Sequence, residues 1–199
     1  MTGETRITYP IKALGGDRLG GYLVLWGAPE RKDLTGEYFT PETEEMDAIY
    51  KAIGKLPFLY GHAMDGALKS TVVGVIDVVA RDEVGLWYEA QLDRSGKYKA
   101  AIQKLAQDGA LGTSSGTLPG ARKVAADGRI ERWPIIEGSA TTSPADPAQM
   151  ERPIGEIKSH FAELGLAFPE ANTPGDAESR AQVAKARLGL LALLAIDTL

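Results

Sequence analysis

Two adjacent serines, Ser114 and Ser115, stand between glycines in residues 109–117 (GALGTSSGT). Small neighbouring residues leave a hydroxyl accessible and allow another stretch of backbone to pass close by. A nucleophilic serine needs such a setting, because a substrate carbonyl must reach its oxygen and N–H groups must stabilise the oxyanion. The segment therefore predicts a nucleophile, with a Gly/Ser-rich turn between two elements as the alternative.

Two distant residues could serve such a serine. His62 ends an extended run and enters a glycine-flanked loop, and its ordinary titration range suits a general base at neutral pH. Glu137 alternates with Trp133, Ile135 and Ser139 on one face of a predicted strand, where a carboxylate is costly unless it is paired. A histidine ring N–H would be a suitable partner. The alternatives are a loop-stabilising histidine and an exposed or Arg/Lys-paired glutamate.

A second arrangement uses the same serine. Residues 112–116 match G-x-S-x-G, the nucleophile elbow of α/β-hydrolases, and Asp146 and His160 follow in the order which that fold requires. The elbow also needs a helix directly after the serine, and Pro119-Gly120 would stop one. The pattern therefore favours a strand at Ser114.

The elements that would position these residues are mostly strands. Alternating or Val/Ile-rich runs predict strands at 7–12, 21–27, 55–62, 70–80, 85–92, 112–117, 121–125 and 129–139. Helices are predicted over 40–53, ended by Gly54, and over 98–107, ended by Gly109. Short turns join most strands, so we expect an α+β, mainly β fold. Its expected form is an antiparallel β-barrel of about seven strands with helices outside.

The character of the sequence changes near residue 150. We expect a domain over 1–150 and a helical C-terminal extension over 151–199, with a linker around 169–175. The apolar end of the extension would pack on the domain, contact another copy, or be removed by self-cleavage.

Composition narrows the function classes. The 199 residues carry a net charge of −5, which argues against a nucleic-acid surface. The sequence has no cysteine and two histidines, so we expect no thiolate catalysis, metal site or cofactor. The longest apolar run, 188–196, is about half of a membrane span, and no signal peptide is evident. We therefore expect no membrane partner.

Three segments together resemble the prohead maturation proteases of tailed bacteriophages, which share their fold with the herpesvirus assemblins. They are residues 59–62 (LYGH) with a following VGV strand at 73–75, residues 109–116 (GALGTSSG), and residues 133–147 (WPIIEGSATTSPADP). Thr113 and Ser115 depart from the family pattern, in which apolar residues are frequent at these positions. The choice between Ser114 and Ser115 therefore stays open, with Ser114 preferred.

The resemblance implies a serine endopeptidase in which His62 is the general base, Ser114 the nucleophile and Glu137 the group that orients His62. Gly116 and Arg122 are the implied candidates for oxyanion or substrate contacts. The implied partners are the major capsid protein or its scaffolding segment and further copies of this chain, inside the assembling prohead in the host cytoplasm. The alternative is a capsid assembly or scaffolding protein with the same barrel and no catalysis.

Overall fold

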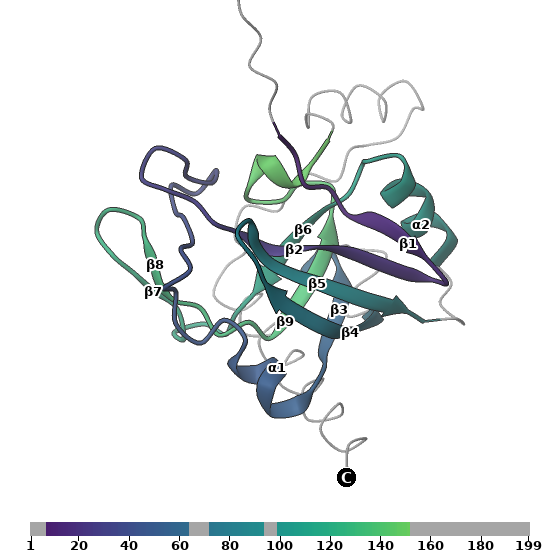
Figure 1. The fold of residues 1–199 in the computed structure, drawn as a ribbon, viewed down its shortest axis with the longest axis horizontal. Helices are drawn as coiled ribbons and strands as arrows, with labels where there is room; N and C mark the ends of the chain where they lie inside the picture. The colour runs from purple at the N-terminus through teal and green to yellow at the C-terminus, as the bar shows by residue number, and fades with distance from the viewer. Residues whose placement is uncertain (1–6, 64–71, 94–98, 152–199) are drawn as a thin grey trace, which may run out of the picture.

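The computed structural model describes residues 7–63, 72–93 and 99–151, which form one strongly curled, mainly β unit (Figure 1). A seven-stranded sheet has the order β1-β2-β5-β4-β3-β9-β6. Its strands are β1 (Lys12–Gly15), β2 (Arg18–Leu25), β3 (Leu56–Tyr60), β4 (Val72–Arg81), β5 (Gly85–Leu92), β6 (Gly112–Gly116) and β9 (Glu137–Thr141). The predicted mainly β class is therefore correct.

The predicted antiparallel barrel differs from the observed sheet in strand direction and in closure. Five of the neighbouring pairs are antiparallel, but β3 and β9 are parallel, with Phe58 opposite Gly138 and Tyr60 opposite Ala140. The sheet is therefore mixed, and it is a curled half-barrel whose strand order starts at β1 and stops at β6. The parallel pairing places the end of β3, which leads into His62, directly beside β9.

The curl brings β6 back towards β2. A Cβ at Gly21 of β2 would lie 3.1 Å from Thr113 Oγ1, so this glycine permits a close approach. Inside the curl, the Tyr88 hydroxyl lies 3.1 Å from the same Thr113 oxygen, and Tyr88 packs beside Phe58. Most of the buried side chains are apolar, and the fully buried ones include Leu19, Leu23, Leu56, Ile76, Leu86 and Leu92. Burial of this surface is the main stabilising contribution.

Helices lie outside the sheet. Helix α2 (Lys99–Gln107) agrees with the predicted helix, and Gly109 follows it with φ 65°. Helix α1 (Ala48–Ile53) ends at the predicted glycine, Gly54, but begins eight residues later than predicted. The reason is pairing: Thr43 Oγ1 donates to Ile130 O, and Glu44 forms a bridge with Arg132. Tertiary contacts thus override a favourable cap sequence.

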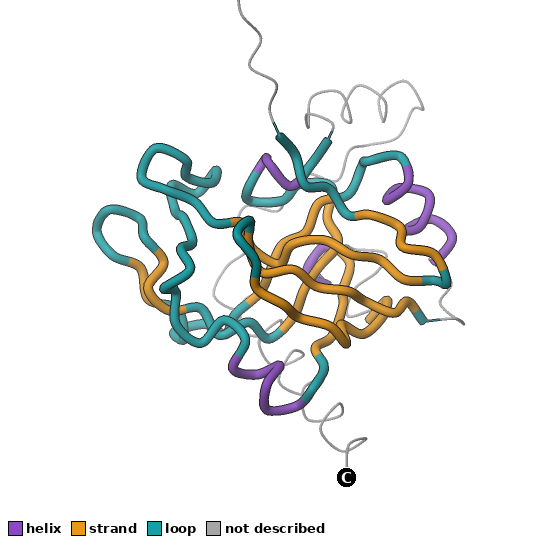
Figure 2. Tube along the Cα trace, in the orientation of Figure 1, coloured by secondary structure: helices purple, strands orange, loops and turns teal. Residues whose placement is uncertain are grey.

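A long loop between β2 and α1 runs beside a small hairpin (Figure 2). The hairpin comprises β7 (Lys123–Val124) and β8 (Ile130–Arg132), and Gly128 occupies its turn with φ 92°. The continuous strand predicted over 129–139 is therefore wrong. It divides into β8 and β9, because Trp133 N and Ile135 N donate to the backbone of the loop, at Glu44 O and Met46 O.

Two further differences concern the ends. The predicted strand at 7–12 begins only at Lys12, because Tyr9 N and Ile11 N donate to Ala148 O and Leu111 O instead of to a strand ladder. The boundary near 150 and the helical extension lie outside the described residues, as does His160. Within residues 7–63, 72–93 and 99–151, no helix is long and apolar enough to cross a membrane.

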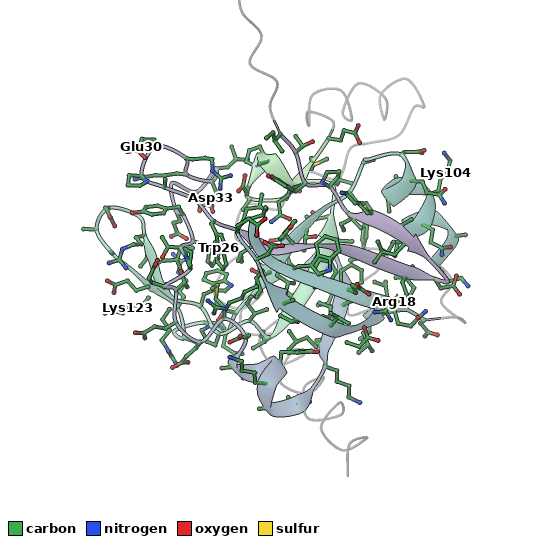
Figure 3. The ribbon with its side chains drawn as sticks, viewed as in Figure 1. Arg18, Trp26, Glu30, Asp33, Lys104 and Lys123 are labelled. Carbon is green, nitrogen blue, oxygen red and sulfur yellow. The ribbon has the colours of Figure 1, made fainter. Side chains whose placement is uncertain are left out.

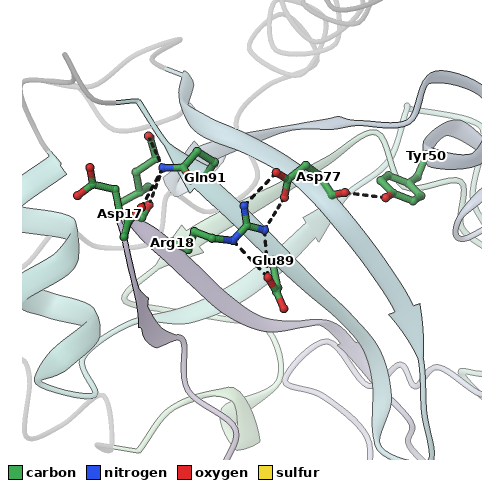
Figure 4. A network of polar contacts seen from close by, with 8 residues as sticks. Asp17, Arg18, Tyr50, Asp77, Glu89 and Gln91 are labelled. Carbon is green, nitrogen blue, oxygen red and sulfur yellow. Dashed lines mark hydrogen bonds and ion pairs between the residues drawn. The ribbon is translucent and has the colours of Figure 1, made fainter.

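Charged side chains lie around the periphery. Lys104 on α2 and Lys123 on β7 project from opposite sides of the molecule (Figure 3). On the outer face of the sheet, Arg18 joins three strands through Asp77 and Glu89 (Figure 4). Of these groups, Arg18 is the one that links strands of the seven-stranded sheet, namely β2, β4 and β5.

Candidate active site

Ser114 lies in β6, the last strand in the order of the sheet, and faces the same side as Glu137. The antiparallel register pairs Ser114 with Ser139 and Gly116 with Glu137. Directly opposed residues share a face, and alternate residues of one strand do as well. Ser114, Ser139 and Glu137 therefore project from one face of the sheet, while Ser114 remains half-buried.

Ser115 projects from the other face. Its partner in the register is Gly138, and its hydroxyl accepts a hydrogen bond of 3.2 Å from Trp133 Nε1. A Cβ at Gly138 would meet Ile76 and Leu23 side chains, so this face is the interior of the curl. The geometry thus separates the two candidate hydroxyls, and only Ser114 shares a face with Glu137.

His62 reaches this face because the chain turns back directly after β3. Gly61 and His62 both have positive φ, 56° and 54°, which is uncommon for a residue with a side chain. Such a conformation costs about 1–3 kcal/mol and persists only where surrounding contacts fix it. Here the His62 N–H donates to Ser139 Oγ at 3.0 Å. The parallel pairing of β3 with β9 places that hydroxyl within reach of the turn.

The imidazole of His62 contacts the carboxylate of Glu137. Nδ1 lies 2.6 Å from Oε1, the Glu137 side chain is 0% exposed, and that of His62 is 19% exposed. An ionised carboxylate can only accept, so Nδ1 carries the proton of this bond. In the neutral ring, Nε2 is then the basic nitrogen. Glu137 therefore fixes the tautomer that a general base requires.

Glu137 is also held from its other oxygen. Ser139 Oγ donates to Oε2 at 3.0 Å. On the neighbouring strand, a Cβ at Gly116 would overlap Oε1, so the glycine leaves the space that the carboxylate fills. A buried carboxylate without such partners would be strongly unfavourable. The sequence thus provides both the partners and the space for this charge.

The Ser114 hydroxyl makes no hydrogen bond within 3.5 Å to His62 or to another residue of the described ranges, although the Ser114 backbone belongs to the β6–β9 ladder. In the absence of substrate, catalytic hydrogen bonds are often long and tighten only in the complex. The structure therefore joins His62 to Glu137 directly, and it brings Ser114 to their face without a bond.

Arg122, the other candidate for oxyanion or substrate contacts, lies near the serine segment but has its own partner. Arg122 Nη2 is 2.8 Å from Glu37 Oε1, and the guanidinium lies 6.0 Å from the centre of the Trp133 ring. It borders a cavity of about 140 Å³, which Ser114 and Ser115 also line. The floor of the cavity is mainly apolar and includes Leu23, Leu25, Phe39 and Ile130.

The hydrolase arrangement receives no support from the placement of Ser114 and Asp146, and His160 lies outside the described residues. Ser114 lies inside a strand and no helix follows it before residue 123, so the strand-turn-helix elbow is absent from this described part of the chain. Asp146 caps a short turn by accepting from Ala148 N at 2.9 Å, and its other oxygen lies 3.9 Å from Arg31. Within the described ranges, no three His, Asp or Glu side chains gather as a metal site requires.

One residue of the site was missed by sequence reasoning. Ser139 is 0% exposed and touches both His62 and Glu137. The alternation of residues predicted that it shares a face with Glu137, but an isolated serine gives no sign of bridging two other residues. The signal that could have found it is its two-residue spacing from a buried carboxylate.

Comparison with known proteins gives little further information. No known protein-family model matches the chain, and no curated protein matches it. Among solved structures, the chain is similar to KSHV protease in complex with a hexapeptide phosphonate inhibitor, with 12% identity and a TM-score of 0.36. The match covers 89% of this chain and 92% of that chain.

Proposed function

We propose that this protein is a serine endopeptidase that works through an acyl-enzyme. The observation that carries the proposal is the 2.6 Å contact between His62 Nδ1 and the buried Glu137 carboxylate, on the face to which Ser114 projects. An acid that fixes the tautomer of a partly exposed histidine beside a serine is the arrangement that acyl transfer needs.

The proposed reaction follows from the roles of the three groups. His62 Nε2 takes the Ser114 proton as Ser114 Oγ bonds to the substrate carbonyl carbon. The C–N bond then breaks, and the same proton passes from His62 to the leaving amine. Water next attacks the acyl-enzyme, gives one proton to His62, and releases the acid as Ser114 regains its proton. Glu137 stays ionised and stabilises the imidazolium in both steps.

The substrates we propose are capsid proteins. The resemblance of residues 59–62, 109–116 and 133–147 to prohead maturation proteases supports this choice, because the three segments contain His62, Ser114 and Glu137 in the family's order. The proposed substrates are the major capsid protein or its scaffolding segment, and further copies of this chain.

The test compares the purified chain with its Ser114→Ala variant, each incubated alone and with the capsid protein of its phage, by intact mass. We expect truncated products only with the unmutated serine. Ser115→Ala is the matched control, because its hydroxyl projects from the opposite face, and it should still cleave. Equal processing by the unmutated chain and Ser114→Ala, or no cleavage of the capsid protein, would leave a non-catalytic assembly role as the better account.

A further variant separates the endopeptidase from the hydrolase arrangement. His160→Ala should retain cleavage, because the proposed base is His62. Loss of cleavage in His160→Ala with full activity in His62→Ala would favour the arrangement of Ser114, Asp146 and His160.

A further inference from the structure

Ser139 occupies the centre of the candidate site. In the parallel pairing it lies opposite Leu59 of β3, and in the antiparallel pairing opposite Ser114 of β6. It therefore stands in the middle strand of the three that carry the base, the acid and the nucleophile. Its side chain is completely buried, and its hydroxyl makes two hydrogen bonds.

The two bonds join the backbone of one catalytic candidate to the side chain of the other. The hydroxyl accepts from His62 N–H at 3.0 Å and donates to Glu137 Oε2 at 3.0 Å. A serine hydroxyl has one proton to donate and lone pairs to accept with, so a single oxygen can satisfy both partners at once. Since Glu137 Oε1 in turn contacts His62 Nδ1, the bonds close a ring through His62, Ser139 and Glu137.

We propose that Ser139 is a positioning residue that fixes His62 and Glu137 in their productive geometry. This role rests on the proposed function for its effect on catalysis, but not for its effect on the His62–Glu137 bond. The unusual left-handed backbone of His62 needs an anchor, and the Ser139 hydroxyl provides one. The same hydroxyl prevents the carboxylate from rotating away from the imidazole.

Loss of the Ser139 hydroxyl should disturb the His62–Glu137 pair more than loss of another buried hydroxyl on the same strand. Thr141 is the matched comparison, because it lies on the same face of the same strand, is also buried, and uses its hydroxyl to accept from Ser143 N at 3.1 Å. Thr141→Val removes a hydroxyl from β9 without removing either bond of Ser139. Any effect of Ser139→Ala that Thr141→Val lacks therefore belongs to the ring.

The test observes the Nδ1–H proton of His62 by NMR, without substrate, in a His160→Gln background that leaves one histidine. We expect a downfield resonance in the parent and in Thr141→Val, and its loss or at least a tenfold faster exchange in Ser139→Ala. Ser139→Cys, which keeps a weak donor, serves if the alanine variant does not fold, and it should also show faster exchange. An unchanged resonance in the folded Ser139 variant would overturn the proposal.

Kinetics then separate this proposal from the proposed function. With a cleavable substrate, kcat of Ser139→Ala should fall about ten- to a hundredfold with KM little changed, because misplacing a catalytic group by about 1 Å costs rate on that order. A kcat within twofold of the parent would also contradict the positioning role. If the parent cleaves nothing, the proposed function fails, while the NMR result still decides whether Ser139 fixes the His62–Glu137 pair.

Discussion

At the scale of single residues, the site depends on one buried charge and its surroundings. Glu137 is fully buried between His62 and Ser139, and Gly116 leaves the space that its carboxylate occupies. A buried carboxylate in contact with an imidazole fixes which ring nitrogen is protonated. The orientation of His62 is thus determined by Glu137 and Ser139, which lie on β9, the strand next to its own.

Replacing Glu137 with glutamine should test this dependence. An amide nitrogen in place of one carboxylate oxygen can donate to Nδ1 and favour the wrong tautomer of His62. We expect kcat for Glu137→Gln to fall by about 10³–10⁴-fold, the size of loss that follows when a triad acid becomes an amide. Cleavage assays at pH 7 would measure it, with Glu131→Gln on the hairpin as a control that retains activity. A loss below tenfold would contradict the role of Glu137.

The sequence pointed to some residues of the candidate site and not to others. His62, Ser114 and Glu137 each carried a local signal: a glycine-flanked loop, a glycine-rich strand and a carboxylate on an apolar face. The separation of Ser114 from Ser115 was predicted by alternation, but the identity of the face required the register with β9. For Ser139 the only local signal was its two-residue spacing from Glu137, and its contact with His62 arises only where β3 and β9 pair.

At the scale of elements, a cluster of charged side chains on the outer face links three strands of the sheet. Arg18 of β2 bonds Asp77 of β4 at 2.7 Å and Glu89 of β5 at 3.0 Å (Figure 4). Asp77 falls at an irregularity in the pairing of β4 with β5, between Ile76 and Val78. The hydrogen bonds from Arg18 lower the pKa of the Asp77 carboxyl below its usual range.

This lowered pKa predicts a pH dependence of stability. Because the folded-state pKa is depressed, the stabilisation is complete above the unfolded pKa of about 3.9 and is lost as pH falls through the folded pKa. Asp77→Asn should therefore reduce the free energy of unfolding at pH 7, by less than about 1 kcal/mol since the pair is partly exposed. Urea unfolding at pH 7 and near pH 2 would measure the difference between variant and parent.

The difference should become smaller as the pH falls, because protonation of Asp77 in the folded state removes the charge that Arg18 binds. A difference of the same size at both pH values would contradict the ionic origin of the effect. Asp108→Asn, which removes an exposed pair between Lys104 of α2 and the residue that follows the helix, is the control and should change stability by at most about 0.5 kcal/mol.

The elements were predicted unevenly. Strand β5 and helix α2 match their predicted ranges closely, because each has a clear period and a clear end signal. The start of α1 and the run over 129–139 were wrong, because Glu44 and Trp133 pair with each other's segments and so take backbone groups from both. Pairing between segments about ninety residues apart leaves no pattern in the local sequence. The parallel pairing of β3 with β9 leaves none either.

At the scale of the whole molecule, the curl of the sheet gives it an interior face, which carries Thr113 and Ser115, and an opposite face, which carries Ser114 and Glu137. The Tyr88 hydroxyl of β5 meets Thr113 Oγ1 of β6 across the interior, and Thr113 N–H donates to Gln149 Oε1 at 3.1 Å. Thr113 immediately precedes Ser114. A polar contact in the core therefore holds the serine strand against the rest of the sheet.

Removing this contact should destabilise the fold. Tyr88→Phe leaves the buried Thr113 hydroxyl without that partner, and we expect the free energy of unfolding to fall by about 1–2 kcal/mol. Tyr50→Phe is the matched control, because its hydroxyl bonds Asp77 O at the surface, and it should have a smaller effect. Denaturant unfolding of both variants would measure the comparison, and equal losses would contradict a special role for the interior contact.

The most direct measurement of the central claim is covalent labelling by a small fluorophosphonate, which reacts with activated serines, followed by intact mass and peptide mapping. We predict one added phosphonyl group on Ser114, retained in Ser115→Ala, absent in Ser114→Ala, and much slower in His62→Ala. Labelling of Ser115, or equal labelling rates in the parent and His62→Ala, would contradict the account of Ser114 as a nucleophile activated by the His62–Glu137 pair.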